Sequence, residues 1–144
     1  MQNPAADSDG ASPTVTHDTD KPSGGELNAG IARAVVHIHR DSVGRGPTKA
    51  QVFFRGNVVV VLLEHVLAKE ERTLVSSGHE DAVMALRHEL LLTMKPELMA
   101  AVETLTNRRV VAMMGDTNLK ADMAGQIFVL DAAIETQPAG APPA

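Results

Sequence analysis

The first apolar stretch of the chain repeats with the period of an amphipathic helix. Its apolar residues recur at steps of three and four positions: Leu27, Ile31, Ala34, Val35 and Ile38. This spacing gathers them on one side of a helix, which we predict over residues 26–42. Gly44 can adopt the left-handed conformation that ends helices, and Gly46-Pro47 prevents regular continuation. The helix should therefore end at this point.

A β-hairpin is predicted next. Residues 50–55 alternate with a period of two, which is typical of a strand that is more buried on one face. Gly56 and Asn57 both tolerate positive φ and predict a tight turn. The following run, VVVVLL at 58–63, is apolar on both faces, so it should be a central strand covered on both sides. Helices should cover one face and something else, such as a second subunit, the other. This is the sequence's indication of a homodimer.

The second half of the chain predicts helices followed by two more strands. AKEERTLVSS should form a short helix ending near Gly78, and a longer helical stretch follows it. Proline removes a backbone donor, so a kink or a break is expected at Lys95-Pro96. Asn107 can cap the last helix, and RRVVAMM and QIFVLD are predicted to be strands. The linker GDTNLKADMAG between them is too long for a tight turn. The apolar side of the long stretch comprises Val83, Leu86, Leu90, Met94, Leu98, Val102 and Leu105.

These elements predict an α+β fold with the order α-β-β-α-α-β-β. A mostly antiparallel four-stranded sheet should carry helices packed on one face. Residues 26–131 form the predicted domain. Residues 1–25 are acidic and rich in Pro, Gly, Ser and Asp, and residues 132–144 are rich in Pro and Ala, so both ends are expected to be disordered tails.

Composition narrows the classes of function. With 144 residues the chain suits one domain, and only three of these residues are aromatic, all of them Phe. Few aromatic rings and a near-neutral central region argue against nucleic-acid binding. The chain has no cysteine, which fits a cytoplasmic location, and no apolar run long enough to insert into a membrane.

Catalytic and metal-binding motifs are not apparent in the sequence. His37 and Asp41 could form a surface pair or half of a metal site, but a third ligand is not evident. Glu70, Glu71, Glu80 and Asp81 are expected to be solvated in the first turns of helices, and the histidines to be partly exposed. We therefore predict a protein that is not an enzyme and has no cofactor or metal. An enzyme would need a cleft joining Arg45 to His37, Asp41 or His88.

The segment GRGPTK is the best candidate for a binding loop. Its two glycines could bring backbone amides close to an anion, while two basic side chains supply charge and a threonine supplies a hydroxyl. The alternative is a structural corner in which Gly44 caps the helix, Gly46-Pro47 turns the chain and Thr48 starts the strand. The candidate binding residues are Arg40, Gly44, Arg45, Gly46, Pro47, Thr48, Lys49 and Arg72.

Several segments together resemble a known bacterial family. They are LNAGIARAVVHIHRDSVGRGPTKAQV, VVVVLLEHVLAKEERTLV, LRHELLL, VETLTNRRVVAMMGDTN and IFVLD. Their order and spacing, and above all the G-R-G-P segment, resemble the MpsC-like family over about residues 26–131. Two positions depart from the family pattern. Ala68 stands where a capping threonine is usual, which should lose about 1 kcal/mol of capping, and Asn107 stands where glycine is usual.

The resemblance implies a role beside a membrane transport system. The family is named for a subunit of a sodium-translocating, membrane-potential-generating system linked to inorganic carbon uptake. The resemblance therefore implies an accessory or regulatory binding module, cytoplasmic or peripheral to the membrane through a transporter partner. The alternative is a cytoplasmic sensor in which the same loop binds bicarbonate, phosphate or a nucleotide. A ligand pocket would place the loop in an enclosed cleft, and a protein interface would leave it exposed.

Overall fold

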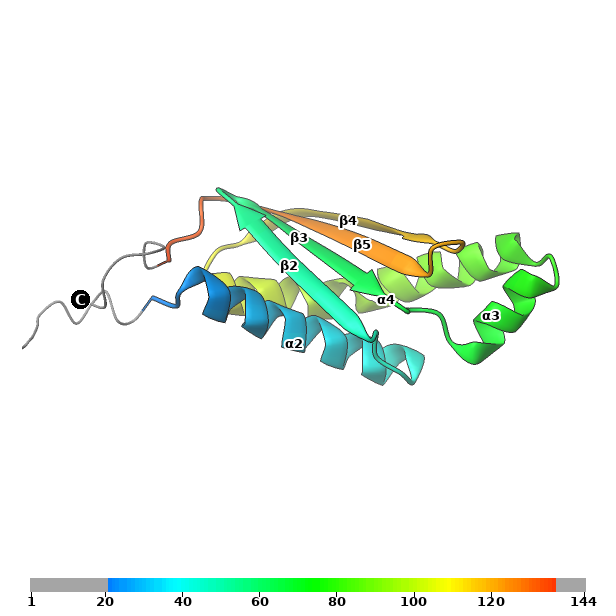
Figure 1. Cartoon of the computed structure of the whole chain (residues 1–144). Helices are drawn as coiled ribbons and strands as arrows, with labels where there is room; N and C mark the ends of the chain where they lie inside the picture. Colours follow the sequence, from blue (N-terminus) through cyan, green and yellow to red (C-terminus); the bar gives the residue numbers. More distant parts are fainter. Residues whose placement is uncertain (1–20, 137–144) are drawn as a thin grey trace, which may run out of the picture. The chain divides into compact units, whose positions relative to one another are not determined.

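The elements follow one another in the predicted order in the computed structural model, which describes residues 21–136 (Figure 1). Residues 28–134 form one compact unit, and residues 21–27 and 135–136 belong to a second one. Most of the two predicted tails, residues 1–20 and 137–144, lies outside the described residues. The elements are α2 (Gly24–Val43), β2 (Lys49–Arg55), β3 (Val58–Glu64), α3 (Lys69–Ser76), α4 (Glu80–Thr106), β4 (Val110–Asn118) and β5 (Met123–Leu130).

Helix α2 begins two residues earlier than predicted because a capping box starts it. The backbone N–H of Glu26 donates to Ser23 Oγ at 3.0 Å, and the N–H of Ser23 donates to Glu26 Oε1 at 2.9 Å. These two bonds satisfy backbone donors that a helix start otherwise leaves unpaired. The predicted apolar side is confirmed further along, where Ile31, Val35 and Ile38 are buried.

The four strands form one sheet in the order β2-β3-β5-β4, and every neighbouring pair is antiparallel. The predicted α+β class is confirmed. Only Gly56, at φ +61°, uses positive φ in the β2–β3 turn. Asn57 instead donates a side-chain hydrogen bond to the carbonyl of Leu130 at 3.0 Å. The last strand in sequence thus lies beside the first hairpin, at the centre of the sheet.

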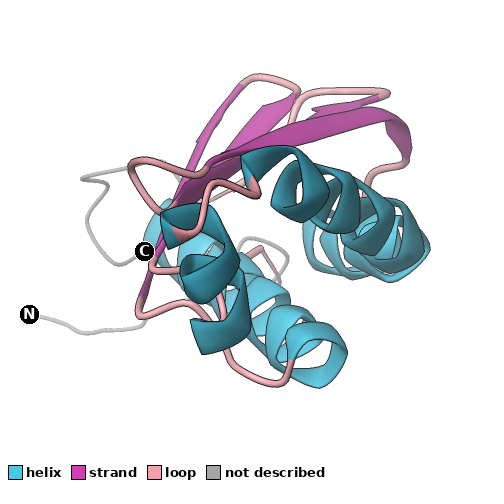
Figure 2. Ribbon diagram, turned by 90° about the vertical axis from the view of Figure 1, so that its right-hand side faces the viewer, coloured by secondary structure: helices cyan, strands magenta, loops and turns pink. Residues whose placement is uncertain are grey.

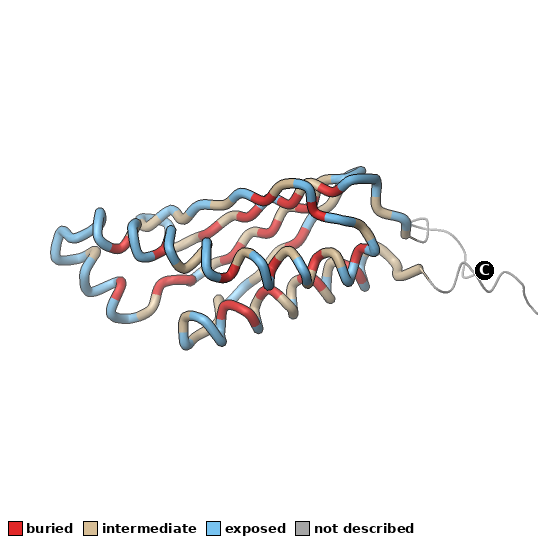
Figure 3. Tube along the Cα trace, turned by 180° about the vertical axis from the view of Figure 1, so that it is seen from behind, coloured by how far each residue is buried: buried red, intermediate tan, exposed pale blue. Residues whose placement is uncertain are grey.

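Helices cover one face of this sheet, as predicted. In Figure 2 the helices lie below the strands, and no helix of residues 21–136 covers the upper face of the sheet. Along β3 and β5, buried residues alternate with residues that are mostly half-buried (Figure 3). Side chains on the helix-covered face are almost completely buried: Val59, Val61, Leu63, Phe128 and Leu130. We call this the inner face and the opposite one the outer face.

Helix α4 differs from its prediction in two ways. It runs unbroken through Pro96, so the expectation of a break is wrong. Pro96 and Leu92, whose carbonyl loses its usual helical donor, are both exposed, and solvent can hydrate that carbonyl. The buried line also contains Arg87, whereas Leu86, placed in it by the sequence, is 46% exposed. One turn of the helix therefore presents an arginine to the interior.

The β4–β5 connection is tighter than the sequence suggests. Polar residues at 116–118 extend β4, and the turn occupies only 119–122. Asn118 Oδ1 accepts the backbone N–H of Ala121 at 2.9 Å, and Asp122 takes positive φ, 55°. The linker judged too long for a tight turn is mostly paired strand, because β4 is an edge strand on which polar residues can reach solvent.

Gly115 allows β4 to lie close to its neighbours, which gives a first prediction. A Cβ built at Gly115 would lie 2.8 Å from the carbonyl oxygen of Gly125 and 3.3 Å from Leu91 Cδ2 on α4. Backbone cannot yield as a flexible side chain can, so Gly115→Ala should lower the free energy of unfolding by about 1–3 kcal/mol. Gly25→Ala, whose Cβ would meet nothing within 4 Å, is the control in urea denaturation. Equal stability of the two variants would contradict this prediction.

Candidate functional site

The GRGPTK loop makes the corner between α2 and β2. Gly44 has φ +89°, and its N–H donates to the carbonyl of Arg40 at 2.9 Å, which ends the helix as predicted. Gly46 lies against α2, because a Cβ there would be 3.1 Å from Val36 Cγ1. Pro47 is half-buried. The two glycines therefore have a structural role, because they allow the chain to leave α2 and turn toward β2.

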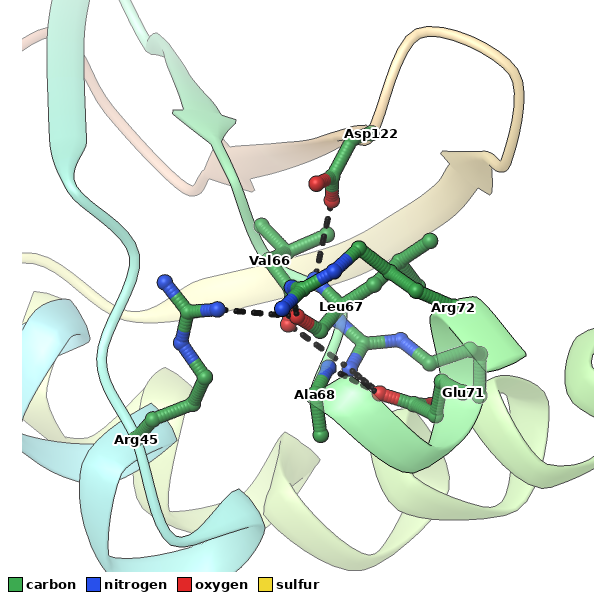
Figure 4. Close-up of polar contacts among 8 residues, drawn as sticks. Arg45, Val66, Leu67, Ala68, Glu71, Arg72 and Asp122 are labelled. Carbon is green, nitrogen blue, oxygen red and sulfur yellow. Dashed lines mark hydrogen bonds and ion pairs between the residues drawn. The ribbon is translucent and has the colours of Figure 1, made fainter. Parts of the chain in front are cut away.

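Two of the predicted binding residues meet at one backbone oxygen. Arg45 Nη1 donates to the carbonyl of Leu67 at 3.0 Å, and Arg72 Nη1 donates to the same oxygen at 2.7 Å. Figure 4 shows the two guanidinium groups approaching Leu67 from the loop and from α3. The two Nη1 atoms are at most 5.7 Å apart, since both contact one oxygen. We call Arg45, Arg72 and the Leu67 carbonyl the arginine corner.

The segment that carries this carbonyl is held by neighbouring side chains. Asp122 Oδ1, from the β4–β5 turn, accepts the N–H of Leu67 at 2.9 Å (Figure 4). Glu71 Oε1 accepts the N–H of Ala68 at 2.8 Å. Ala68 makes no side-chain cap, as expected from its departure from the family pattern. The Leu67 carbonyl is thus fixed from several directions, and the arginine corner is a rigid feature.

A buried ion pair lies behind the arginine corner. Arg87 Nη1 is 3.4 Å from Glu71 Oε1, and the two side chains are only 4% and 5% exposed. The same Nη1 donates to the carbonyl of Val66 at 3.4 Å. The expectation that Glu71 is solvated in a helix first turn is therefore wrong. Its side chain folds back over the helix start and reaches a cation on α4.

The other charged and polar residues of the predicted site do not join the arginine corner, although Arg40 Nη2 lies beside the loop, 3.6 Å from where a Cβ of residue 46 would be. The N–H of Thr48 donates to the carbonyl of Glu64 at 3.0 Å, and Thr48 Oγ1 contacts His65 Nδ1. Lys49 Nζ lies 3.8 Å from Glu64 Oε2. Arg40 is exposed on the last turn of α2. Thr48 and Lys49 therefore contact the end of β3, and the structure brings together Arg45 and Arg72 among the charged candidates.

A second buried polar pair joins α2 to the sheet. His39 Nε2 and Gln126 Nε2 are 3.0 Å apart, so the amide donates to a neutral imidazole. Burial, reinforced by the positive charge of Arg87, lowers the pKa of His39 to about 4. The expectation that the histidines are partly exposed is wrong for His39. Its position four residues after Val35, on the apolar side of α2, was the available signal.

The cavity beside this pair is small. It measures about 20 Å³ and is lined by His39, Arg87, His88 and Gln126 among others. That volume suits a water molecule and is too small for a multi-atom ligand. His88 lines it, but Arg45 and His37 do not, so this cavity is not the cleft that the enzyme alternative requires.

Metal ligands do not gather in the part of the chain that the structure describes. His37 Nε2 lies 3.2 Å from Asp41 Oδ2, and both side chains are exposed, which makes them the surface pair considered from the sequence. Across residues 21–136, no group of three or more His, Asp or Glu side chains is placed to hold an ion. Cation chemistry therefore has no support from these residues.

Comparison with known proteins gives one match. The family described as Na+-translocating membrane potential-generating system (MpsC) matches residues 23–132. Neither the curated proteins nor the solved structures contain a match. Between residues 21 and 136, no helix has both the length and the apolar character needed to cross a membrane.

Proposed function

The chain belongs to the MpsC family of the Na+-translocating membrane potential-generating system, and on this premise we propose that it is a non-enzymatic accessory module of a membrane ion-transport system. In this proposal it binds the transport protein through the arginine corner. It works in the cytoplasm and reaches the membrane through that partner. The family supports the setting, and the geometry of Arg45 and Arg72 supports the contact.

The convergence of two guanidinium groups on one carbonyl is the observation that carries this proposal. Two like charges about 5 Å apart repel each other by about 1–3 kcal/mol at effective dielectric constants between those of water and a protein surface. An incoming carboxylate relieves that repulsion. Each guanidinium has five N–H donors, and one from each is used at Leu67. Arg45 is half-buried and Arg72 is exposed, so the corner can be reached from solvent.

The partner feature that fits is an acidic side chain or short acidic segment of the transport protein. A planar carboxylate accepts two parallel bonds from a guanidinium, which gives direction as well as charge. Lysine supplies the positive charge but cannot donate two parallel hydrogen bonds to one carboxylate. Arg45→Lys should therefore bind more weakly than the intact protein but more strongly than Arg45→Ala.

Retention of the transport protein on the immobilised full chain tests this function. The intact chain should retain an integral membrane transport protein from native membranes, and the purified pair should bind again after reconstitution. Arg45→Ala and Arg72→Ala should each lower this binding by about tenfold or more. Arg33→Ala, an exposed arginine in the middle of α2, is the control and should bind normally. Circular dichroism confirms equal folding of all variants.

Two results would overturn the proposed contact or the proposed function. Equal binding by Arg45→Ala, Arg72→Ala and the intact chain would exclude the arginine corner as the contact. Failure of the intact chain to bind a transport protein would exclude the accessory role. Titration of bicarbonate and phosphate against thermal stability then tests the sensor alternative. A rise in Tm that is absent from the Arg45→Ala, Arg72→Ala double variant would support it.

A further inference from the structure

The outer face of the sheet is apolar at its centre, and no helix among the described residues covers it (Figure 2). Strand pairing arranges its side chains in four rows, each running from β2 through β3 and β5 to β4. Phe53, Met114 and Ile127 are 55%, 50% and 38% exposed, and Val60 between them is half-buried. The rows are Arg55–Val58–Val129–Ala112, Phe53–Val60–Ile127–Met114, Gln51–Leu62–Gly125–Asp116 and Lys49–Glu64–Met123–Asn118.

We propose that a second copy of this chain covers the outer face, with a two-fold axis parallel to the strands between β3 and β5. Such an axis turns each row over onto the same row of the partner, so that β2 lies over β4. Two sheets that pack face to face keep their strands within about 30° of each other, which this arrangement satisfies. An interface between identical surfaces has to be complementary to itself, and the rows meet that condition.

The two middle rows show the complementarity most clearly. Phe53 would lie over Met114 of the partner subunit, which pairs an aromatic ring with a thioether. Leu62 would lie over the partner's Gly125, where a Cβ would meet nothing within 4 Å in the single chain. The leucine side chain of each subunit thus fills the space above the glycine of the other, so the same contact occurs twice in the dimer. Close packing of apolar faces depends on such alternation of large and small residues.

Charges on the rim favour the same axis. The β2 edge of the outer face ends in the cations Lys49 and Arg55, whereas the β4 edge carries Asp116. Turning β2 over β4 brings the Gln51 amide to the partner's Asp116. Lys49, which pairs with Glu64 in its own chain, would lie over the partner's Asn118, one row from Asp116, and Arg55 would lie over the partner's Ala112. A two-fold axis across the strands would instead place Arg55 over the partner's Lys49 and Met114 over the partner's Asp116. That arrangement opposes two cations, whereas the proposed axis places no like charges directly over each other.

The outer face is large enough for a dimer. Four strands spaced about 4.8 Å apart and seven residues at about 3.4 Å each project an area of about 450 Å² per subunit. Two facing copies bury about 900 Å² before the relief of the side chains is counted, and specific interfaces begin near 1,000 Å². This flat area lies just below that threshold, and the relief of the side chains adds to it, so the size fits a weak dimer.

Light scattering after size exclusion, with the full chain over a range of concentrations, tests the dimer. The intact chain should have twice its monomer mass. Ile127→Lys should raise the dissociation constant by about tenfold or more, because a lysine would be buried without a partner. Leu92→Lys, at an equally accessible apolar position on α4 that is 49% exposed, should leave the dimer intact. A chain that stays monomeric at every concentration would overturn the proposal.

An exchange of side chains tests the axis itself. Gly125→Leu should abolish the dimer, because two leucines would then compete for one space. Adding Leu62→Ala should restore it, since a large side chain again faces a small one. A dimer that persists in both Ile127→Lys and Gly125→Leu but is lost in Leu92→Lys would place the interface on the helices and overturn the proposal. The proposed dimer interface does not include the arginine corner. A result that overturns the dimer therefore leaves the proposed binding of a transport protein untouched, and the reverse also holds.

Discussion

Replacing Glu71 with glutamine should lower the free energy of unfolding by about 3–5 kcal/mol. Glutamine keeps the shape of the side chain and an oxygen that can accept the N–H of Ala68. It removes the negative charge 3.4 Å from Arg87 Nη1, in a place where both side chains are almost fully buried. Arginine stays protonated even when it is buried, so the positive charge of Arg87 would remain in the interior without a compensating negative charge.

Urea unfolding measures this loss, and Glu70→Gln is the matched control. Glu70 is the preceding residue in the first turn of α3 and is exposed, so its replacement should change stability by less than about 0.5 kcal/mol. Combining Glu71→Leu with Arg87→Met removes both charges and should be less destabilising than the sum of the two single replacements. Additive effects in this cycle would show that the two charges do not stabilise each other.

Acidification should destabilise the protein between pH 6.5 and about 4. An unfolded histidine has a pKa near 6.5, whereas burial and Arg87 lower that of folded His39 to about 4. Between these values the unfolded chain binds the additional proton, so stability falls as the pH falls, by about 3 kcal/mol from this residue. Protonation would also set a ring N–H against the Gln126 amide, which now donates to that nitrogen.

The pH dependence of urea unfolding can be assigned by comparing two histidine variants. In His39→Leu the baseline stability should be lower, because the Gln126 amide loses its acceptor, and the slope between pH 4 and 6.5 should be shallower. His37→Gln, on the exposed side of the same helix, should keep the slope of the intact chain. An unchanged slope in His39→Leu would show that other groups cause the acid sensitivity.

The parts of the fold that followed from sequence were those set by local periodicity. The three- and four-residue spacing on α2 and the two-residue alternation on β2 each depend on neighbours within the same element. The six consecutive apolar residues of β3 predicted a cover on each face of the sheet; the helices on one face are confirmed, and a second subunit on the other stays a prediction. The family resemblance built on the same segments was also confirmed, over residues 23–132.

The sequence predictions failed where a residue depends on a contact with a residue far away in the chain. Periodicity placed Leu86 in the core, but Arg87 takes that position because Glu71, on another helix, compensates its charge. The loop containing Arg45 was singled out for its charge. Its contact is a backbone carbonyl, at Leu67, and a main-chain acceptor leaves no trace in a sequence. The polar end of β4 looked like a linker because edge strands tolerate polar residues.

The strand order has a consequence for synthesis of the protein. Of the four described strands, β5 is the last to leave the ribosome, yet β3 needs it as a neighbour along its whole length. Until residues 123–130 emerge, one edge of the most apolar strand stays open to other chains. The sheet can close only after translation of the domain is complete. Nascent chains in a polysome are therefore most vulnerable to mispairing during the interval between the synthesis of β3 and that of β5.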